Sequence, residues 1–282
     1  MTLSGKQYEE IVSCVISAAL AEDIDGGDIT TEAIVPKNKI ASAKLVAKEP
    51  LVVAGLLISE KVFKAVDKRI KFASLANDGE RVKKGAVLAR ISGSAASVLK
   101  AERTALNFLQ RMSGIATLTS EFVERTKGTK TKILDTRKTT PCMRIFEKYA
   151  VKAGGGLNHR FGLFDAILIK DNHIAIAGGI EKAVMAARKK HGNKAFIEVE
   201  TKNLEEVKEA VKLGVQVIML DNMDINKMKK AIRLIGKKAR TEISGGVNLK
   251  NIKKLASLGP THISIGALTH SARAMDISLE VD

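Results

Sequence analysis

The sequence contains few of the residues that form disulfides or stack on nucleic-acid bases. Its 282 residues include no tryptophan, two tyrosines, two cysteines and four prolines. The two cysteines, Cys14 and Cys142, cannot make a disulfide framework, and neither has a partner at metal-ligand spacing. We therefore expect neither a secreted, disulfide-stabilised domain nor a zinc site, and we predict a cytoplasmic location.

Long apolar runs are also missing. No run approaches the ~20 residues of a membrane-spanning helix. The apolar stretch 11–21 resembles the core of a signal peptide, but Glu9 and Glu10 stand where such a signal needs positive charge. Because its apolar residues recur at helical spacing, we predict a docked amphipathic helix and no membrane partner.

Negative charge is scarce relative to positive charge. There are 47 basic and 31 acidic residues, which gives a net charge of +16. Such an excess suggests nucleic acid or an acidic surface as a partner, but the lysines are dispersed along helical faces with glutamates between them. We favour a solvated, lysine-rich surface without a nucleic-acid partner. A basic nucleic-acid-binding protein is the alternative, and steeply salt-dependent affinity for duplex DNA would support it.

The pattern of the chain changes near its middle. Strand patterns at 43–48, 51–54, 70–73 and 86–91 surround a helical stretch at 56–66, and one long helical region follows at 97–127, with Gly114 as a candidate kink. We predict an N-terminal α/β sandwich domain over residues 1–112 and a second domain over 113–282. The last residues are candidates for packing back onto the first domain.

In the second half, charged or glycine-bearing positions follow short apolar runs. From Lys170 on, these end points fall at residues 170, 200, 221, 244 and 266, with a helical pattern in nearly every gap. Alternating strands and helices predict a parallel sheet, and chemistry at the C-terminal strand ends is typical of an α/β barrel. Since six strands are clear instead of the eight of a closed barrel, we predict an incomplete, TIM-like barrel that binds an anionic substrate.

Two basic segments are candidates for binding that anion. In 135–140, the adjacent cations Arg137 and Lys138 point in different directions, so one can pair with a carboxylate while the other faces a phosphate. In 154–160, three glycines allow close backbone approach, and His159 and Arg160 supply donors. A solvated basic loop and a flexible helix end are the structural alternatives.

The next strand ends carry a lysine and several carboxylates. Lys170 follows an apolar strand, where its charge needs a nearby anion or carboxylate. Glu198 and Glu200 alternate along a strand and so point to one face. With Asp221, Glu200 can hold a hydrated Mg²⁺ or face a developing sugar cation. His173 has no ligand-spaced partner, and we interpret it as structural or as a residue that supports a neighbouring site residue.

Glycines end the last two strands, in Ser244-Gly245-Gly246 and Ile265-Gly266-Ala267. Backbone N–H groups at such turns form the phosphate site found after the seventh and eighth strands of α/β barrels. Ordinary strand-to-helix turns are the alternative, and two such segments in succession favour phosphate binding.

Taken together, these motifs resemble the quinolinate phosphoribosyltransferase family, also called carboxylating nicotinate-nucleotide pyrophosphorylases. Cys142, where a glycine is expected, and Leu157, where lysine or glycine is frequent, depart from the family pattern. The matching segments run in order over nearly the whole chain: Glu102–Asn107, Ser113–Thr117, Asp135–Pro141, Asn158–Arg160, Ile169–His173, Glu198–Glu200, Leu220–Asn222, Ser244–Asn248 and Ile265–His270.

The resemblance implies transfer of a phosphoribosyl group from phosphoribosyl pyrophosphate (PRPP) to quinolinate, with Mg²⁺ and with decarboxylation, in NAD biosynthesis. It implies a homodimer or higher oligomer in which one subunit's Arg103 reaches its partner's substrate. A homologue associated with molybdate transport shares this fold, but the full set of cations favours the quinolinate enzyme. The implied catalytic residues are Lys138, Lys170, Glu200 and Asp221, the last two also holding the metal. The implied substrate-binding residues are these four and Arg103, Thr136, Arg137, His159 and Arg160, with Ser244, Gly245, Gly246, Ile265, Gly266 and Ala267 for phosphate.

Overall fold

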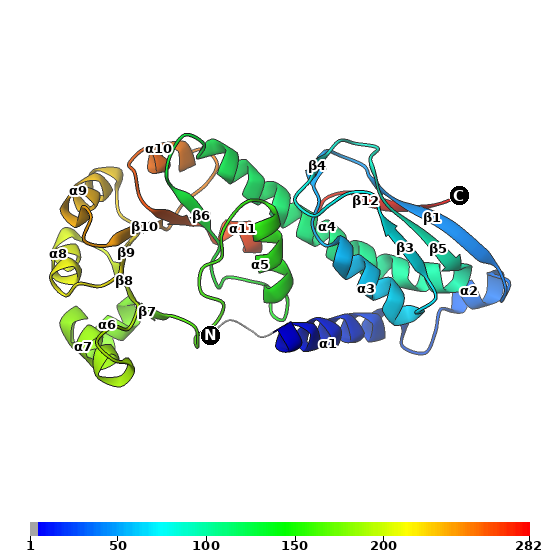
Figure 1. Cartoon of the computed structure of the whole chain (residues 1–282), viewed down its shortest axis with the longest axis horizontal. Helices are drawn as coiled ribbons and strands as arrows, with labels where there is room; N and C mark the ends of the chain where they lie inside the picture. The colour runs from blue at the N-terminus through cyan, green and yellow to red at the C-terminus, as the bar shows by residue number, and fades with distance from the viewer. Residues whose placement is uncertain (1–4) are drawn as a thin grey trace. The chain divides into compact units, whose positions relative to one another are not determined.

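The computed structural model describes residues 5–282 (Figure 1). The chain divides into two compact units, and each unit is built from segments that are separate in the sequence. The N-terminal unit holds the described residues up to Ser120, Thr139–Gly155 and Leu268–Asp282, and the barrel unit holds Glu121–Lys138 and Gly156–Ala267. The predicted boundary between residues 112 and 113 falls inside one helix, α4 (Ala95–Arg125). Residues 1–4, where the predicted first domain begins, lie outside the described part.

An antiparallel sheet of four strands forms the centre of the N-terminal unit. The last strand of the chain, β12, pairs with β1 along five residues, so the C-terminal segment completes this sheet. The strand order is β12 (Ile277–Val281), β1 (Ile40–Ala47), β5 (Val87–Ser94) and β3 (Lys71–Ser74), and β2 (Leu51–Val52) pairs with β4 (Arg81–Val82) separately. The other elements are α1 (Gly5–Ile24), α2 (Ile29–Ile34), α3 (Leu56–Val66), most of α4, α5 (Arg144–Ala153) and most of α11 (Ala267–His270).

Helices of this unit form where apolar residues recur every three or four positions. Val12, Ile16 and Leu20 are buried along α1, which confirms an amphipathic helix at the signal-like stretch. In α3 the Ser59 hydroxyl donates to the Ala105 carbonyl of α4, at 3.2 Å, so these two helices pack closely.

The predicted kink at Gly114 is absent, because α4 continues unbroken through it. A Cβ atom at residue 114 would lie 1.9 Å from the carbonyl oxygen of Arg273. Glycine is therefore needed at this position for the close approach of another segment, and the helical hydrogen bonds are preserved.

Six parallel strands form the sheet of the barrel unit. Their order is β6 (Lys132–Leu134), β11 (His262–Ser264), β10 (Arg240–Ser244), β9 (Val217–Asp221), β8 (Ile197–Thr201) and β7 (Ile167–Ile169). Among the described strands β6 and β7 end this order, so the barrel is incomplete, as predicted. Helices α6 (Asp171–Ala177), α7 (Ile180–His191), α8 (Leu204–Lys212), α9 (Ile225–Ile235) and α10 (Ile252–Ala256) connect the strands, and Figure 1 shows α7, α8 and α9 along the outside.

The connections have local reasons in the sequence. Asn203 caps α8, because its side-chain oxygen accepts the N–H of Glu206 at 2.9 Å. Glu206 in turn accepts the N–H of Lys202, one residue before the cap, so the start of the helix carries a shifted form of the capping box. The strand β9 is apolar until Asp221, as expected for a sheet covered by helices.

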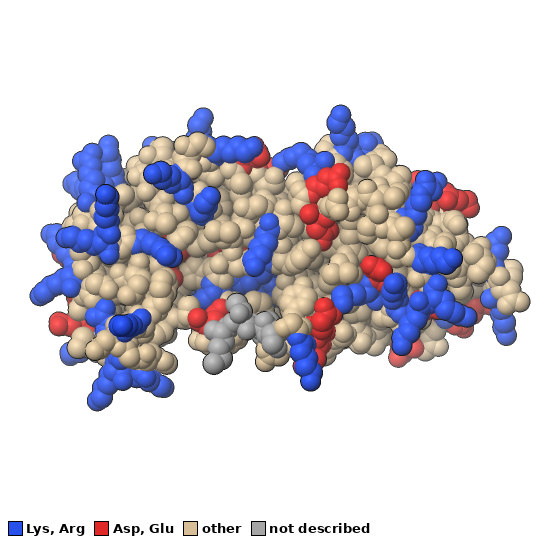
Figure 2. All heavy atoms as spheres, in the orientation of Figure 1, with Lys and Arg blue, Asp and Glu red and all other residues tan. Residues whose placement is uncertain are grey.

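Lysine and arginine side chains are spread over each unit on the face drawn in Figure 2, with Asp and Glu among them. This is the distribution expected of a solvated, lysine-rich surface. Within residues 5–282, no helix combines the length and the apolar character needed to cross a membrane.

Candidate active site

The predicted site residues of the barrel unit lie at the C-terminal ends of its parallel strands. Asp135 and Lys170 directly follow β6 and β7, Glu200 is the last residue but one of β8, and Asp221 and Ser244 end β9 and β10. The register pairs Ser244 with Asp221, so these two strand ends are neighbours. Because all strands of the sheet are parallel, the residues share one edge.

Glu200 is the centre of a group of charges at this edge. Burial raises its pKa, and the nearby carboxylates of Asp221 and Asp171 raise it further, whereas Lys170 and Lys202 act in the opposite direction. Two carboxylates beside a half-buried third create a need for a cation, and hard oxygen ligands are those that Mg²⁺ prefers.

Lys202 and Asp171 were missed in the sequence analysis. The Lys202 ammonium lies 2.8 Å from the Asp171 carboxylate, which opens α6 directly after Lys170. A helix beginning at residue 171 was also missed, and the His173 ring accepts the Lys170 N–H at 2.9 Å. The His173 ring therefore orders the backbone at Lys170.

The glycine at 245 is required by a close approach. Its φ is +91°, and a Cβ atom there would lie 2.1 Å from the side-chain oxygen of Asn222. Asn222 follows Asp221 and has its own φ of +51°, and its amide donates to the Asp221 carboxylate at 2.9 Å. The turn after β10 thus packs directly against the carboxylate-bearing turn after β9.

A buried aspartate fixes the basic segment after the three glycines. Asp135 is fully buried, and its two oxygens accept the side-chain amide of Asn158 at 2.5 Å and the backbone N–H of His159 at 2.9 Å. Leu157 adds a bridge to Leu134 at the end of β6. The segment is therefore an ordered extension of the sheet at this point.

His159 points toward two glutamates that are buried in the barrel unit. Its Nε2 atom lies 3.0 Å from Glu198 Oε2 and 3.6 Å from Glu242 Oε1, and the glutamates are 5% and 1% exposed. Burial, reinforced by the Glu198 carboxylate, raises the pKa of Glu242 to about 7. Neither glutamate was predicted as a site residue. A charged residue inside an otherwise apolar strand could have indicated them, because such charges are rarely buried without a partner.

Arg160 lies close to a second arginine. Burial lowers its pKa, and the charge of Arg137 lowers it further, whereas Glu198 and Asp165 raise it. One guanidinium nitrogen donates to the Ala166 carbonyl at 3.0 Å, and the buried Nε atom makes no hydrogen bond within the described part of the chain. Two cations held together in a partly buried position favour the binding of an anion.

The remaining predicted residues fall into two groups. Thr136 accepts the Lys138 N–H at 3.0 Å, which forms the turn that exposes Lys138. Arg103 lies on α4 in the N-terminal unit and is exposed. Gly266 and Ala267 follow β11 directly after Ile265, at the same edge as the other strand ends.

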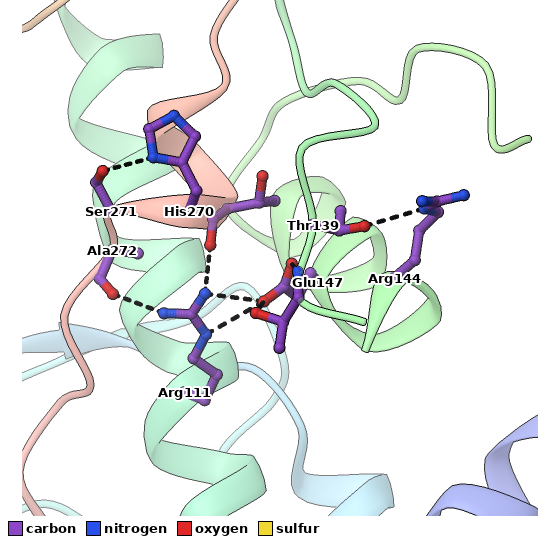
Figure 3. A network of polar contacts seen from close by, with 9 residues as sticks. Arg111, Thr139, Arg144, Glu147, His270, Ser271 and Ala272 are labelled. Carbon is purple, nitrogen blue, oxygen red and sulfur yellow. Dashed lines mark hydrogen bonds and ion pairs between the residues drawn. The ribbon is translucent and has the colours of Figure 1, made fainter. Parts of the chain in front are cut away.

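A polar network in the N-terminal unit follows the segment that carries Lys138 (Figure 3). Glu147 is fully buried and accepts the guanidinium of Arg111 at 2.8 Å. It also accepts the backbone N–H and hydroxyl of Thr140, at 3.1 and 2.9 Å, and Arg111 donates to the carbonyls of Thr269 and Ala272. Thr140 lies two residues after Lys138 and Thr269 two residues after Ala267, so the network orders the chain just beyond these two predicted site residues.

Comparison with known families shows which proteins this chain is similar to. The quinolinate phosphoribosyl transferase N-terminal domain model matches residues 28–113, and the C-terminal domain model matches residues 115–280. A probable nicotinate-nucleotide pyrophosphorylase [carboxylating] from Bacillus subtilis is 43% identical over 260 residues, which covers 92% of this chain and 90% of that protein. A mitochondrial quinolinate phosphoribosyltransferase [decarboxylating] from Nicotiana glauca is 42% identical over 287 residues, covering 95% and 81%.

Solved structures show the same similarity in three dimensions. NadC from Streptococcus pyogenes is 41% identical, with a TM-score of 0.93 over 100% of this chain and 99% of that one. The nicotinate-nucleotide pyrophosphorylase from Ehrlichia chaffeensis is 39% identical, with a TM-score of 0.93 over 100% of both chains. Both domain models match in order, and relatives above 30% identity cover nearly the whole chain, so this protein belongs to the quinolinate phosphoribosyltransferase family.

Proposed function

We propose that this protein transfers the phosphoribosyl group of PRPP to quinolinate, giving nicotinate mononucleotide, pyrophosphate and CO₂ in NAD biosynthesis. One observation carries the proposal: cations and carboxylates gather on one edge of the six-stranded sheet in a chain of this family. The relatives from Bacillus and Nicotiana are named for a carboxylating pyrophosphorylase and a decarboxylating quinolinate phosphoribosyltransferase.

Quinolinate is a planar dicarboxylate, and arginine forks match carboxylates in shape and charge. Arg137 and Arg160 are neighbours, and burial, followed by the charge of Arg137, lowers the pKa of Arg160. A bound dicarboxylate relieves this repulsion. We propose that Arg103 of a partner subunit adds a third guanidinium to the dicarboxylate site. His159 belongs to the same binding segment as Arg160.

PRPP offers three groups to the same edge. We propose that the pyrophosphate, which leaves as an anion, is bound by Lys138 and Lys170. Thr136 shapes the turn that carries Lys138. Glu200 and Asp221 are proposed to face the ribose hydroxyls and the oxocarbenium-like charge of the transition state. The N–H groups of Ser244–Gly246 and Ile265–Ala267 are proposed to hold the 5′-phosphate.

Mg²⁺ is proposed to enter with PRPP and to be held by Glu200 and Asp221. Burial, and then the carboxylates of Asp221 and Asp171, raise the pKa of Glu200. The oxygen donors fit a hard divalent cation, which would relieve the repulsion among the carboxylates. When bound, the ion supplies charge neutralisation for the leaving pyrophosphate. Lys170 and Lys202 already supply part of this charge.

The reaction then needs positioning more than a strong acid or base. The ring nitrogen of quinolinate forms a bond to C1 of the ribose as the bond to pyrophosphate breaks, and the ring becomes cationic. The adjacent carboxylate leaves as CO₂. The electron pair of the broken bond stays on the ring carbon, where the neighbouring cationic nitrogen stabilises it, and a proton then binds to that carbon. Cations that hold the carboxylates in a fixed orientation serve both steps.

We further propose a cytoplasmic homodimer, or a higher oligomer, that acts on these small molecules and has no nucleic-acid or membrane partner. Exposed apolar side chains on the barrel unit support an interface, since Leu163, Phe164 and Ile176 are 72%, 61% and 88% exposed. A mixture of Arg103→Ala and Lys170→Ala subunits tests the shared site: mixed dimers regain activity if Arg103 acts across the interface, and absence of complementation contradicts it.

The function itself is tested by comparing purified protein on quinolinate and on nicotinate, each with PRPP and Mg²⁺. Quinolinate should be consumed with release of pyrophosphate, and nicotinate, which lacks the second carboxylate, should react poorly. Activity on nicotinate alone would contradict the assignment of two arginines to a dicarboxylate.

A further inference from the structure

Both ring nitrogens of His159 have hydrogen-bonding partners inside the protein. Nδ1 accepts the backbone N–H of Arg160 at 2.8 Å. Nε2 lies 3.0 Å from Glu198 Oε2. A ring nitrogen that accepts an N–H carries no proton itself, so the proton of the neutral ring is on Nε2 and is donated to Glu198. The hydrogen-bond network thus defines one tautomer.

We propose that Glu198 is a positioning residue for the dicarboxylate substrate, acting through the His159 ring on Arg160. This inference rests on the proposed function. Glu198 orients the ring by accepting Nε2–H, and the ring orients the backbone of Arg160 by accepting its N–H. A carboxylate that sets the tautomer of a histidine through its far nitrogen is a recurrent device in metal sites and catalytic triads.

The same segment is fixed from its other side. Asp135 accepts the backbone N–H of His159 at 2.9 Å and the side-chain amide of Asn158. Asp135 is fully buried and Glu198 is 5% exposed, so both acceptors are shielded from water. Arg160 is therefore presented from a backbone that buried carboxylates hold on both sides of His159.

Glu242 supplies a matched comparison. It is as buried as Glu198 and faces the same ring, but its nearest oxygen is 3.6 Å from Nε2, beyond hydrogen-bond distance. If burial of a carboxylate near His159 were sufficient, the two glutamates would be equivalent. If the hydrogen bond is what matters, only Glu198 is required.

The kinetic test uses Glu198→Leu, Glu198→Gln and Glu242→Gln. Glu198→Leu removes the acceptor and should raise the KM for quinolinate about tenfold, as for loss of one charge-assisted hydrogen bond, with the KM for PRPP nearly unchanged. Glu198→Gln keeps an acceptor oxygen and should restore most of the quinolinate affinity, and Glu242→Gln should behave like wild type. Equal increases in both KM values for Glu198→Leu, or an equal defect in Glu242→Gln, would overturn the proposal.

The spectroscopic test does not depend on turnover. Protein labelled with ¹⁵N in histidine should show for His159 one protonated Nε2 and one unprotonated Nδ1, assigned by comparison with His159→Gln. Glu198→Leu should lose this single-tautomer pattern and Glu198→Gln should keep it. A His159 protonated on Nδ1 in wild type, or a metal ion retained at Nε2 through dialysis against a chelator, would refute the inference.

The two tests also separate this inference from the proposed function. If wild-type protein makes no product from quinolinate, the function fails while the tautomer is still readable. If quinolinate is turned over but the tautomer or the KM pattern is wrong, the function stands and the role of Glu198 is refuted. If the Glu198→Leu variant does not fold, the wild-type spectrum and the Glu198→Gln variant still test the role of Glu198.

Discussion

Arg111 and Glu147 form an ion pair whose carboxylate is fully buried, with Nη2 of the arginine 2.8 Å from Oε1 of the glutamate (Figure 3). The glutamate also holds Thr140, two residues beyond Lys138. A buried carboxylate that accepts several donors is strongly destabilised when its cation is removed.

Replacing Arg111 by methionine should therefore lower the free energy of unfolding by about 3–5 kcal/mol, because Glu147 is left buried without a cation. Urea denaturation measures the change. Lys6→Ala is the control, since Lys6 lies 3.9 Å from Glu10 on an exposed face of α1 and should change stability by less than about 0.5 kcal/mol. A loss below about 1 kcal/mol in Arg111→Met would show that the ion pair adds little to stability.

Removing either proposed substrate cation should abolish most turnover while the fold survives. Arg137→Ala and Lys170→Ala should each lower kcat/KM by about a hundredfold or more, because each removes a charge-assisted hydrogen bond to an anion. Cys142→Ala should remain active, since the proposed chemistry uses no thiol. Thermal melting checks the fold. A wild-type rate in either variant would contradict the proposed role of that residue in substrate binding.

The turn after β10 should tolerate no side chain at residue 245. Gly245 and Gly192 both have φ of +91°, but a Cβ atom at 192 meets nothing within 4 Å, whereas at 245 it meets Asn222 at 2.1 Å. Alanine at either position costs about 1–3 kcal/mol of backbone strain. Only Gly245→Ala should also raise the KM for PRPP, because it displaces the turn beside Asp221. An unchanged KM for PRPP in Gly245→Ala would contradict a role of this turn in phosphate binding.

Stability should depend on pH through Glu49. Hydrogen bonds from Arg273, and then from the Asp276 N–H, lower the pKa of Glu49 from 4.5 to about 2. A carboxyl with a depressed pKa in the fold stabilises above its unfolded pKa and loses that contribution as pH falls through the folded value. Glu49→Gln should thus lower stability at neutral pH by about 1 kcal/mol, after allowance for solvent screening.

The difference between Glu49→Gln and wild type should narrow between pH 4.5 and about 2. Arg273→Met should cause a similar loss at neutral pH, and the double variant should add little to either single change, because the two side chains form one pair. A difference that stays constant as pH falls would rule out Glu49 ionisation as its cause.

Much of this fold could be predicted from periodicity, and the exceptions have physical reasons. The strand ends at Lys170, Glu200 and Asp221 follow from apolar runs that stop at a charge. The kink expected at Gly114 was wrong, because the glycine is needed for contact with Arg273, a residue far away in sequence. Local patterns do not report such long-range contacts.

The site was predictable where charges stand at strand ends and less so where they lie inside the barrel unit. Glu198 was noted only for its alternation with Glu200, and Glu242 was passed over, because nothing in either strand shows that the loop segment after Gly156 brings His159 beside them. The pairing of Lys202 with Asp171 was missed for a similar reason, since 31 residues separate them.

The proposed reaction is best tested by following quinolinate labelled with ¹³C in the carboxylate next to the ring nitrogen, with purified protein, PRPP and Mg²⁺. We expect one labelled CO₂ for each pyrophosphate released, with nicotinate mononucleotide as the remaining product. Pyrophosphate release without labelled CO₂, or no reaction with quinolinate at all, would contradict it.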